Sequence, residues 1–424
     1  MQNNSRQYIQ SVSIIGILFF IFGFVTWLNG PLITFVKLAF SLDTDAKAFW
    51  VTTAFYMAYF FLAIPSSWIL ERTGMKKGMA LGLLVMAIGT FVFGHFATAR
   101  DYTASLIGLF VIGSGLSVLQ TACNPYISII GPIESAAQRI SVMGICNKVA
   151  GILSPIILGA FVLKDIDKLE QTVANAPSPE AGEQVLATFA STIYTPYMIM
   201  AVVLALLAIW ITQSPLPEVK ASEANQEHPK ANQASKQSIF QFPHLWLGVL
   251  CLFLYVGAEV MAGDAIGTYG RGFNLPADET KYFTSFTLIA MLVGYLIGLA
   301  AIPKWITQQA ALKISAILGL VFTLAALLTS GYVSVGFVAA LGLANALMWP
   351  AIFPMAIEGL GKFTERGSAL LIMGIAGGAI IPKLFAEFKT PDNFQWVFFI
   401  LMLPCYLYIL YYSVAGHLAG KAKS

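Results

Sequence analysis

Charged residues are scarce in this chain. Asp, Glu, Lys and Arg make up only 11% of its 424 residues, whereas hydrophobic residues make up 58%. A soluble domain carries about 25% charged residues, because water must wet its surface. Lipid must therefore solvate most of this surface, and apolar runs of about 20 residues recur from end to end. This composition excludes a nucleic-acid binder, a secreted enzyme and a receptor with a single membrane span.

Cysteine and histidine are also sparse, with four of each. The cysteines fall inside apolar stretches, which excludes an extracellular disulfide framework. The histidines lie near helix ends or in loops and lack the spacing of metal ligands. The sequence also shows no cluster of a nucleophile with a general base. We therefore expect no catalytic residues, no metal site and no cofactor other than a coupling cation. A membrane-embedded enzyme is disfavoured.

The apolar runs predict an all-α membrane protein with twelve transmembrane helices. The helices are expected near residues 11–36, 48–70, 78–98, 104–130, 140–163, 192–213, 244–270, 282–302, 310–330, 334–358, 367–388 and 394–416. The first is expected to be retained, because no small-residue cleavage site follows it. One longer polar segment lies near 164–190. Another, at 214–243, has the composition of a cytoplasmic linker and separates an N-terminal six-helix lobe (1–213) from a C-terminal one (244–424).

Lys and Arg predict the orientation of the chain. If both termini are inside, the inner segments carry fourteen of these residues and the outer segments nine. Cytoplasmic loops carry the excess of Lys and Arg in multi-pass membrane proteins. We therefore expect a multi-pass protein of the cell inner membrane with both termini cytoplasmic. We also expect it to be a monomer that is embedded in the lipid bilayer and binds no nucleic acid.

The two halves resemble each other in register. Gln120–Pro125 matches Asn345–Pro350, and Val142–Ile145 matches Ile372–Ile375. A duplicated six-helix unit is typical of two-lobed secondary transporters, whose site lies between the lobes near the bilayer midplane.

Three ionisable residues lie deep within the expected helices: Lys148 in the fifth, and Glu259 and Asp264 in the seventh. A charge at the bilayer centre costs at least ~2.5–3.5 kcal/mol, so each needs a partner or water. We expect Lys148 and Glu259 to face a central aqueous cavity. Asp264 lies 140° around a regular helix from Glu259, so both reach one cavity only if the helix breaks between them. An ion pair that only fixes packing is the alternative for Lys148 and the two acids, and a cap near an outer helix end is a further alternative for Asp264.

Amide side chains form a second, uncharged set. Gln120 and Asn124 share a helix face at i, i+4, Asn147 adjoins Lys148, and Asn345 is the repeat partner of Gln120. Amides donate and accept hydrogen bonds, as a sugar's hydroxyls require, and flat aromatic rings suit a pyranose. Packing roles are the alternative. The expected substrate-binding residues are Asn29, Gln120, Asn124, Asn147, Lys148, Asn345 and Trp349, with further aromatic surface from Trp27, Tyr56, Tyr59 and Tyr255.

The loop after the second expected helix, Ser67–Lys77, resembles the major facilitator signature, in which an acid and a basic cluster surround a glycine. Such a loop can latch the cytoplasmic side of the two lobes, which is a conformational role. The residues that carry it are Glu71, Arg72, Gly74 and Lys76.

Five further segments resemble the fucose, glucose/galactose and N-acetylglucosamine symporter branch of the major facilitator superfamily. They are Phe22–Gly30, Gln120–Tyr126, Arg139–Asn147, Thr195–Ile199 and Tyr255–Glu259. The resemblance covers nearly the whole chain. It implies a major facilitator fold and a cation-coupled sugar symporter that imports a hexose or an N-acetylhexosamine by alternating access.

This chain departs from the fucose:proton members of that branch at two positions. Those members have acids where this chain has Gly30 and Gln120, and neither of these residues can titrate. At Gln120 the chain is similar to the glucose/galactose members. It is similar to the N-acetylglucosamine permeases at Gly30, at Lys148 and in the run Gly257–Asp264. We expect Glu259 or Asp264 to bind the coupling cation, and the sequence leaves open whether this is H⁺ or Na⁺.

Two other functions remain open within the sequence. An exporter of drugs or metabolites would share the fold, although its site would be more apolar and poorer in amides. A non-transporting nutrient sensor would usually carry a large soluble domain, which this sequence lacks.

Overall fold

The computed structural model of the chain describes residues 2–130, 136–218, 238–302 and 304–421. Within these residues, twelve helices are long and apolar enough to cross a membrane, which confirms the predicted all-α membrane fold. Helices satisfy every backbone hydrogen bond internally, which lipid cannot do for them. Many large apolar side chains remain exposed on the outside of the bundle, for example Phe161 and Leu328 at 74% each, as expected of a surface that faces lipid.

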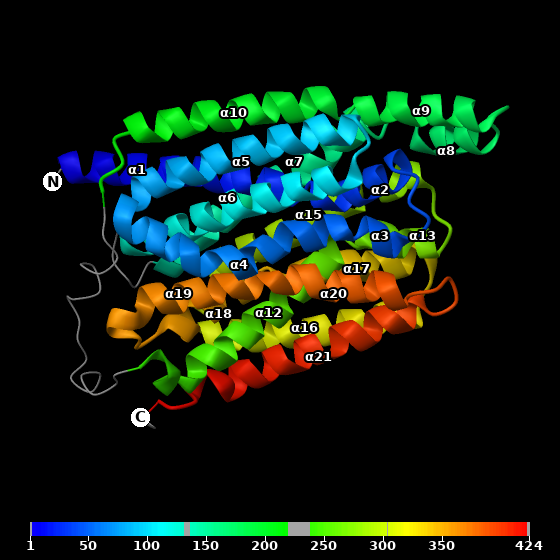
Figure 1. Cartoon of the computed structure of the whole chain (residues 1–424). Coiled ribbons are helices and arrows are strands. Elements are labelled where there is room, and N and C mark those ends of the chain that lie inside the picture. The colour runs from blue at the N-terminus through cyan, green and yellow to red at the C-terminus, as the bar shows by residue number, and fades with distance from the viewer. Residues whose placement is uncertain (1, 131–135, 219–237, 303, 422–424) are drawn as a thin grey trace.

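The first half of the chain forms six spans (Figure 1). Its helices are α1 (Gln2–Thr26), α2 (Asn29–Ala39), α3 (Asp45–Ala48), α4 (Trp50–Thr73), α5 (Met75–Thr98), α6 (Tyr102–Ile129), α7 (Ala136–Phe161), α8 (Ile166–Ala174), α9 (Pro179–Ser191) and α10 (Tyr194–Gln213).

The second half forms the other six spans. Its helices are α12 (Pro243–Gly263), α13 (Ile266–Gly272), α14 (Ala277–Thr280), α15 (Phe283–Ala301), α16 (Gln308–Leu328), α17 (Gly331–Asn345), α18 (Met348–Ile357), α19 (Thr364–Met373), α20 (Gly377–Phe388) and α21 (Phe394–Val414). Short 3₁₀ turns are η2 (Ile239–Gln241), η3 (Gly361–Phe363), η4 (Gly374–Ala376) and η5 (Gly416–Leu418).

The most extensive helix contacts between the halves are those of α4 with α19 and α20 and of α7 with α15. Helix α1 begins and α21 ends at one end of the bundle, which we call the terminal end; the opposite end, with α8 and α9, is the far end (Figure 1). The predicted linker falls largely on residues 219–237, outside the described residues. The division into two lobes at 214–243 therefore stays a prediction.

Two spans at corresponding places in the two halves are broken. The first divides into α1 and α2 at Trp27 and Leu28, and the seventh divides into α12 and α13 at Asp264 and Ala265. The carbonyls of Ala262 and Gly263 at the end of α12 accept hydroxyl hydrogen bonds from α15, both at 2.8 Å. Broken helices inside a membrane are tolerated where neighbours satisfy the freed backbone groups.

The polar segment near 164–190 contains two helices that hydropathy alone does not reveal, α8 and α9. Helix α9 has a recognisable start: the Ser178 side chain caps it by accepting a hydrogen bond from the Ala181 N–H, and Pro179 follows at its first position. It leads into α10, so the sixth span reads as Pro179–Gln213.

At the far end the two halves are joined by a reciprocal pair of aspartates, which we call the aspartate clasp. The Asp167 carboxylate of α8 accepts hydrogen bonds from the backbone N–H groups of Ala277 and Asp278 at 2.9 and 3.0 Å. The Asp278 carboxylate of α14 accepts from the N–H groups of Ile166 and Asp167 at 3.2 and 3.4 Å. Each carboxylate thus caps the first turn of a helix from the other half, where free N–H groups favour negative charge.

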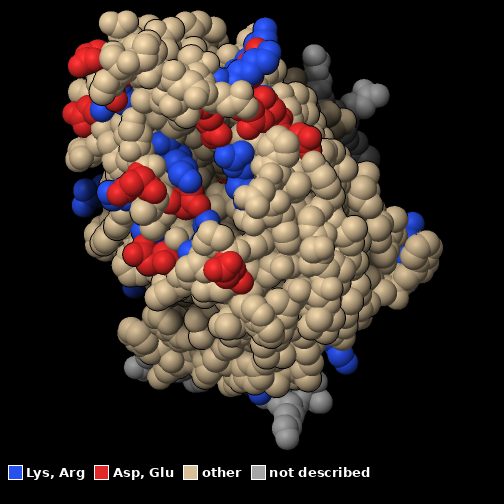
Figure 2. Space-filling model, turned by 90° about the vertical axis from the view of Figure 1, so that its right-hand side faces the viewer, with Lys and Arg blue, Asp and Glu red and all other residues tan. Residues whose placement is uncertain are grey.

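Ion pairs surround the clasp. Lys281 donates to Asp278 and to the Leu163 carbonyl, both at 2.7 Å. Arg271 pairs with Glu170 across the halves at 3.1 Å. Figure 2 shows this end of the molecule, where acidic and basic side chains are mingled over part of the face. These contacts hold the far ends of the two halves together.

Candidate functional site

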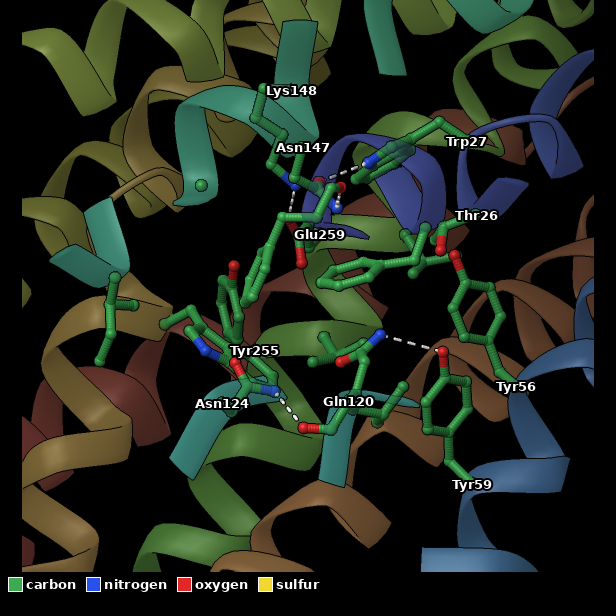
Figure 3. Close-up of a pocket in the computed structure, with 18 of the residues that line it drawn as sticks. Thr26, Trp27, Tyr56, Tyr59, Gln120, Asn124, Asn147, Lys148, Tyr255 and Glu259 are labelled. Carbon is green, nitrogen blue, oxygen red and sulfur yellow. Dashed lines mark hydrogen bonds and ion pairs between the residues drawn. The ribbon is translucent and has the colours of Figure 1, made fainter. Parts of the chain in front are cut away.

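A cavity lies near the centre of the bundle, between helices of the two halves (Figure 3). Its volume is about 100 Å³, smaller than the roughly 300–1,000 Å³ of typical small-molecule sites, so a sugar enters only if the lining residues move apart. Helices α1, α4, α6 and α7 line it from the first half, and α12, α15, α18 and η4 from the second. The lining residues are Phe19, Phe22, Thr26, Trp27, Tyr56, Tyr59, Gln120, Asn124, Ile140, Gly144, Asn147, Lys148, Tyr255, Val256, Glu259, Val260, Tyr295, Trp349 and Ile375.

A buried ion pair spans this cavity from one half to the other. The Lys148 ammonium of α7 donates to the Glu259 carboxylate of α12 at 2.8 Å. The two side chains are only 7% and 11% exposed. The ammonium also lies 4.4 Å from the centre of the Trp27 ring, a cation–π contact. Both residues therefore line one cavity, and each serves as the other's counter-charge.

Trp27 stands at the break between α1 and α2 and is only 2% exposed. Its indole N–H donates to the Asn147 side-chain oxygen at 3.3 Å. Two glycines make room for the ring: a Cβ added at Gly151 or Gly263 would lie 2.5 or 2.4 Å from ring atoms of Trp27. The ring therefore packs the break between α1 and α2, in the first half, against the end of α12 in the second half.

We expect Gly263→Ala to disrupt this contact. The added methyl group has no room beside Trp27, so the ring must move and the two helix breaks must separate, at a cost of about 1–3 kcal/mol typical of overpacking. The thermal midpoint of the purified protein should fall. Gly336→Ala is the control, because no atom lies within 4 Å of its added Cβ. An equal midpoint in both variants would contradict the contact.

Two amides of α6 face the cavity on one helix face (Figure 3). The Gln120 side-chain amide donates to the Tyr59 hydroxyl at 3.0 Å, and the Asn124 amide donates to the Gln120 carbonyl at 3.0 Å. Asn147 contributes a third amide from α7, beside the ion pair. The cavity therefore combines amide donors and acceptors with aromatic rings.

Two residues of the expected substrate set do not line this cavity. Asn345 ends α17 and is fully buried, where its side-chain oxygen accepts a hydrogen bond from the Tyr406 hydroxyl of α21 at 2.9 Å. Asn29 begins α2 and is 1% exposed. Neither residue lines the cavity, and the side-chain nitrogen of each has no hydrogen-bond partner among the described residues.

Asp264 also lies outside the cavity lining, directly behind it. It is 1% exposed, and one carboxylate oxygen accepts from the Tyr56 hydroxyl at 3.4 Å. Its other oxygen accepts no hydrogen bond from any described residue. The break in the seventh span falls at Asp264 itself and not between it and Glu259, so the two carboxylates do not share the cavity. Tyr56, which does line it, connects Asp264 to the site.

Residues 15–382 match the family model described as the Major Facilitator Superfamily. The chain belongs to this superfamily of membrane transporters. A glucose/galactose transporter of Brucella abortus biovar 1 (strain 9-941) is 29% identical over 417 residues, which cover 98% of this chain and 96% of the relative. An L-fucose-proton symporter of Escherichia coli (strain K12) is 27% identical over 383 residues, covering 89% and 86%.

A solved structure supports the superfamily assignment. The crystal structure of the major facilitator transporter FucP in the outward conformation matches with a TM-score of 0.75 and 25% identity, covering 96% of this chain and 98% of that one. The predicted major facilitator fold and the resemblance to the fucose and glucose/galactose branch are thereby confirmed. These relatives are transporters and not enzymes.

The major facilitator signature loop lies at the terminal end, between α4 and α5. Glu71 and Arg72 are exposed and make no hydrogen bond or ion pair with another described residue. Lys76 donates to the Ser214 carbonyl after α10 at 2.7 Å. Gly74 has a φ of +79°, a conformation that favours glycine. Among the described residues, the side chains of Glu71 and Arg72 therefore have no partner in this structure, in which the aspartate clasp joins the two halves at the far end.

Several lining residues were missed in the sequence analysis, among them Phe19, Phe22, Thr26, Gly144 and Tyr295. Helical spacing could have found most of them. Phe19, Phe22 and Thr26 follow one another at three and four residues on α1, and Gly144 precedes Lys148 by one turn, so each set shares a face.

Proposed function

We propose that this protein is a cation-coupled symporter that imports a sugar, a hexose or an N-acetylhexosamine, by alternating access. The observation that carries the proposal is the central cavity, where amides from α6 and α7 meet aromatic rings and a buried ion pair between the two halves. Amides match a sugar's hydroxyls, and the rings offer flat faces to a pyranose. The names of the glucose/galactose and fucose relatives support the same substrate class.

The coupling cation is proposed to bind at the acids of the seventh span, Glu259 or Asp264. A cation that binds together with sugar drives import because its affinity differs between the two access states. The signature loop with Glu71 and Arg72 would latch the terminal end when the far end opens. Both termini are proposed to be cytoplasmic, which would make the clasped far end the outer one.

Uptake into proteoliposomes tests the function directly. We expect labelled glucose or N-acetylglucosamine to accumulate when a pH gradient or a Na⁺ gradient is imposed, and to exchange in counterflow when neither is. If neither sugar enters under any of these conditions, the proposed substrate class is wrong.

Replacement of a lining amide tests the location of the site. We expect Gln120→Ala to weaken sugar binding about tenfold, because one or two neutral hydrogen bonds of about 0.5–1.5 kcal/mol each are lost. Binding is measured by titration of purified protein. Gln184→Ala, on the exposed part of α9, serves as the control. Asn345→Ala should lower stability more than affinity, since Asn345 bonds to Tyr406 and not to the cavity. If Gln120→Ala binds sugar as tightly as the wild type does, the proposed location of the sugar site at α6 is wrong.

A further inference from the structure

The two acids of the seventh span differ in how their charge is balanced. Glu259 pairs with Lys148 at 2.8 Å, so this pair is neutral as a unit. Asp264, 1% exposed, has no ion-pair partner among the residues that the structure describes. The titratable and charged groups that face it are the Tyr56 hydroxyl of α4, Glu259 of its own helix and Lys148 of α7. With the pair neutral, an ionised Asp264 is the single uncompensated charge of this region, which is costly in a buried site.

The surroundings of Asp264 suit a carboxylate that is ionised in one state and protonated in another. It lies at the break between α12 and α13, opposite the N-terminus of α2, whose dipole favours a negative charge. A Cβ added at Gly30 would lie 3.3 Å from the unpartnered Asp264 oxygen and 2.4 Å from the Thr284 hydroxyl oxygen. Because Gly30 has no side chain, this Asp264 oxygen is not crowded. The N-terminal end of α2 stabilises a negative charge on Asp264 in part but does not neutralise it.

We infer that Asp264 is the coupling site and that the ion it binds is a proton, whereas Glu259 stays paired with Lys148. This inference rests on the proposed sugar symport and selects one carboxylate and one cation from it. Protonation converts the Asp264 carboxylate into a neutral carboxyl group. The halves then close around a region without net charge.

The surroundings of Asp264 favour a proton over Na⁺. A proton needs one oxygen, and the Asp264 oxygen without a hydrogen bond supplies it. A Na⁺ ion needs several oxygen ligands, and the nearby carbonyls of Ala262 and Gly263 would have to be shared with the threonine hydroxyls that they already accept. The Tyr56 hydroxyl points its hydrogen at the carboxylate.

Tyr56 links the proton to the sugar. It lines the cavity, and its hydroxyl donates to Asp264 at 3.4 Å. An ionised Asp264 holds this hydroxyl, whereas a protonated one no longer needs it as a donor and releases it towards the cavity. Sugar binding and proton binding thereby favour each other, and thermodynamic linkage makes the effect reciprocal.

The test compares Asp264→Asn with wild type in proteoliposomes that contain the full chain. The probes are labelled glucose, galactose, L-fucose and N-acetylglucosamine. Asparagine imitates the protonated carboxyl group, so we expect counterflow exchange to persist while pH-driven accumulation falls to an inside-to-outside ratio of about 1. Sugar affinity should weaken as pH rises in wild type and become independent of pH in the variant. Asp43→Asn is the matched control, because Asp43 is exposed and its only ion pair with a described residue is with Lys47.

A second measurement does not depend on the variant. Adding sugar to wild-type proteoliposomes without a gradient should move protons together with the sugar, which a pH dye inside the vesicles records. Accumulation that survives in Asp264→Asn, or wild-type accumulation driven by Na⁺ without proton movement, would overturn the inference and leave sugar symport intact. Absence of both uptake and counterflow for all four sugars in wild type would instead refute the proposed function.

Discussion

Replacing Glu259 by glutamine, or Lys148 by methionine, is expected to destabilise the protein strongly. Each single change leaves the other charge buried without a partner, at about 3–5 kcal/mol. The double variant Lys148→Met/Glu259→Gln removes both charges together and should recover most of this loss. The free energy of the pair is obtained from thermal midpoints of the four proteins, as in a double-mutant cycle.

An exposed ion pair of the same length provides the control for this cycle. Lys47 and Asp43 also lie 2.8 Å apart, but their side chains are 57% and 66% exposed. Exposed pairs contribute only about 0–1 kcal/mol, so Lys47→Met and Asp43→Asn should change the midpoint little, alone or together. If the losses at Lys148 and Glu259 simply add in the double variant, the two charges are not coupled and the pair does not stabilise the interface.

Removing both carboxylates of the clasp, with Asp167→Ala/Asp278→Ala, is expected to open the far end. Four hydrogen bonds to backbone N–H groups of the opposite half are lost at once. Hydrogen bonds to a charged group contribute about 1.5–3 kcal/mol each, less where water reaches them. Even one such contribution shifts the equilibrium between the closed and the open far end by about tenfold or more.

Distances between spin labels can follow this opening. Labels at Gln171 on α8 and Asp392 before α21 are exposed and lie on opposite halves at the far end. Their distance distribution should gain a longer component in the double variant. Asp165→Asn is the control, because within the described part of the chain Asp165 pairs only with Lys168 of its own half, at 3.8 Å. An unchanged distribution would show that Arg271, Lys281 and their partners close the far end without the clasp.

The spans could be predicted from the sequence because hydropathy alone determines which stretches enter lipid. The need for a partner at Lys148 also followed from the cost of a buried charge. Its identity did not, since Glu259 lies 111 residues further along the chain. Only the packing of the two halves, with α7 against α15, brings them together.

The expected amide site was harder to resolve. Gln120 and Asn345 occupy matching repeat positions, yet one faces the cavity and the other bonds to Tyr406. The rotation of each helix about its axis decides between these outcomes, and α17 is apolar on every side, so its sequence does not encode that rotation. The helices of 164–190 were missed for a different reason. Their polar composition resembles a loop, and the capping signal at Ser178 and Pro179 is local.

The separation of Lys148 and Glu259 along the chain also bears on biosynthesis. The ribosome adds about 5–20 residues per second, so Lys148 enters the bilayer on the order of ten seconds before its counter-ion is made. During this interval α7 carries an unneutralised ammonium group that opposes insertion by about 2.5–3.5 kcal/mol. The fifth span is therefore the one whose insertion should remain reversible until α12 arrives. A nascent chain stopped before residue 243 should hold α7 in the membrane less firmly than the finished protein does.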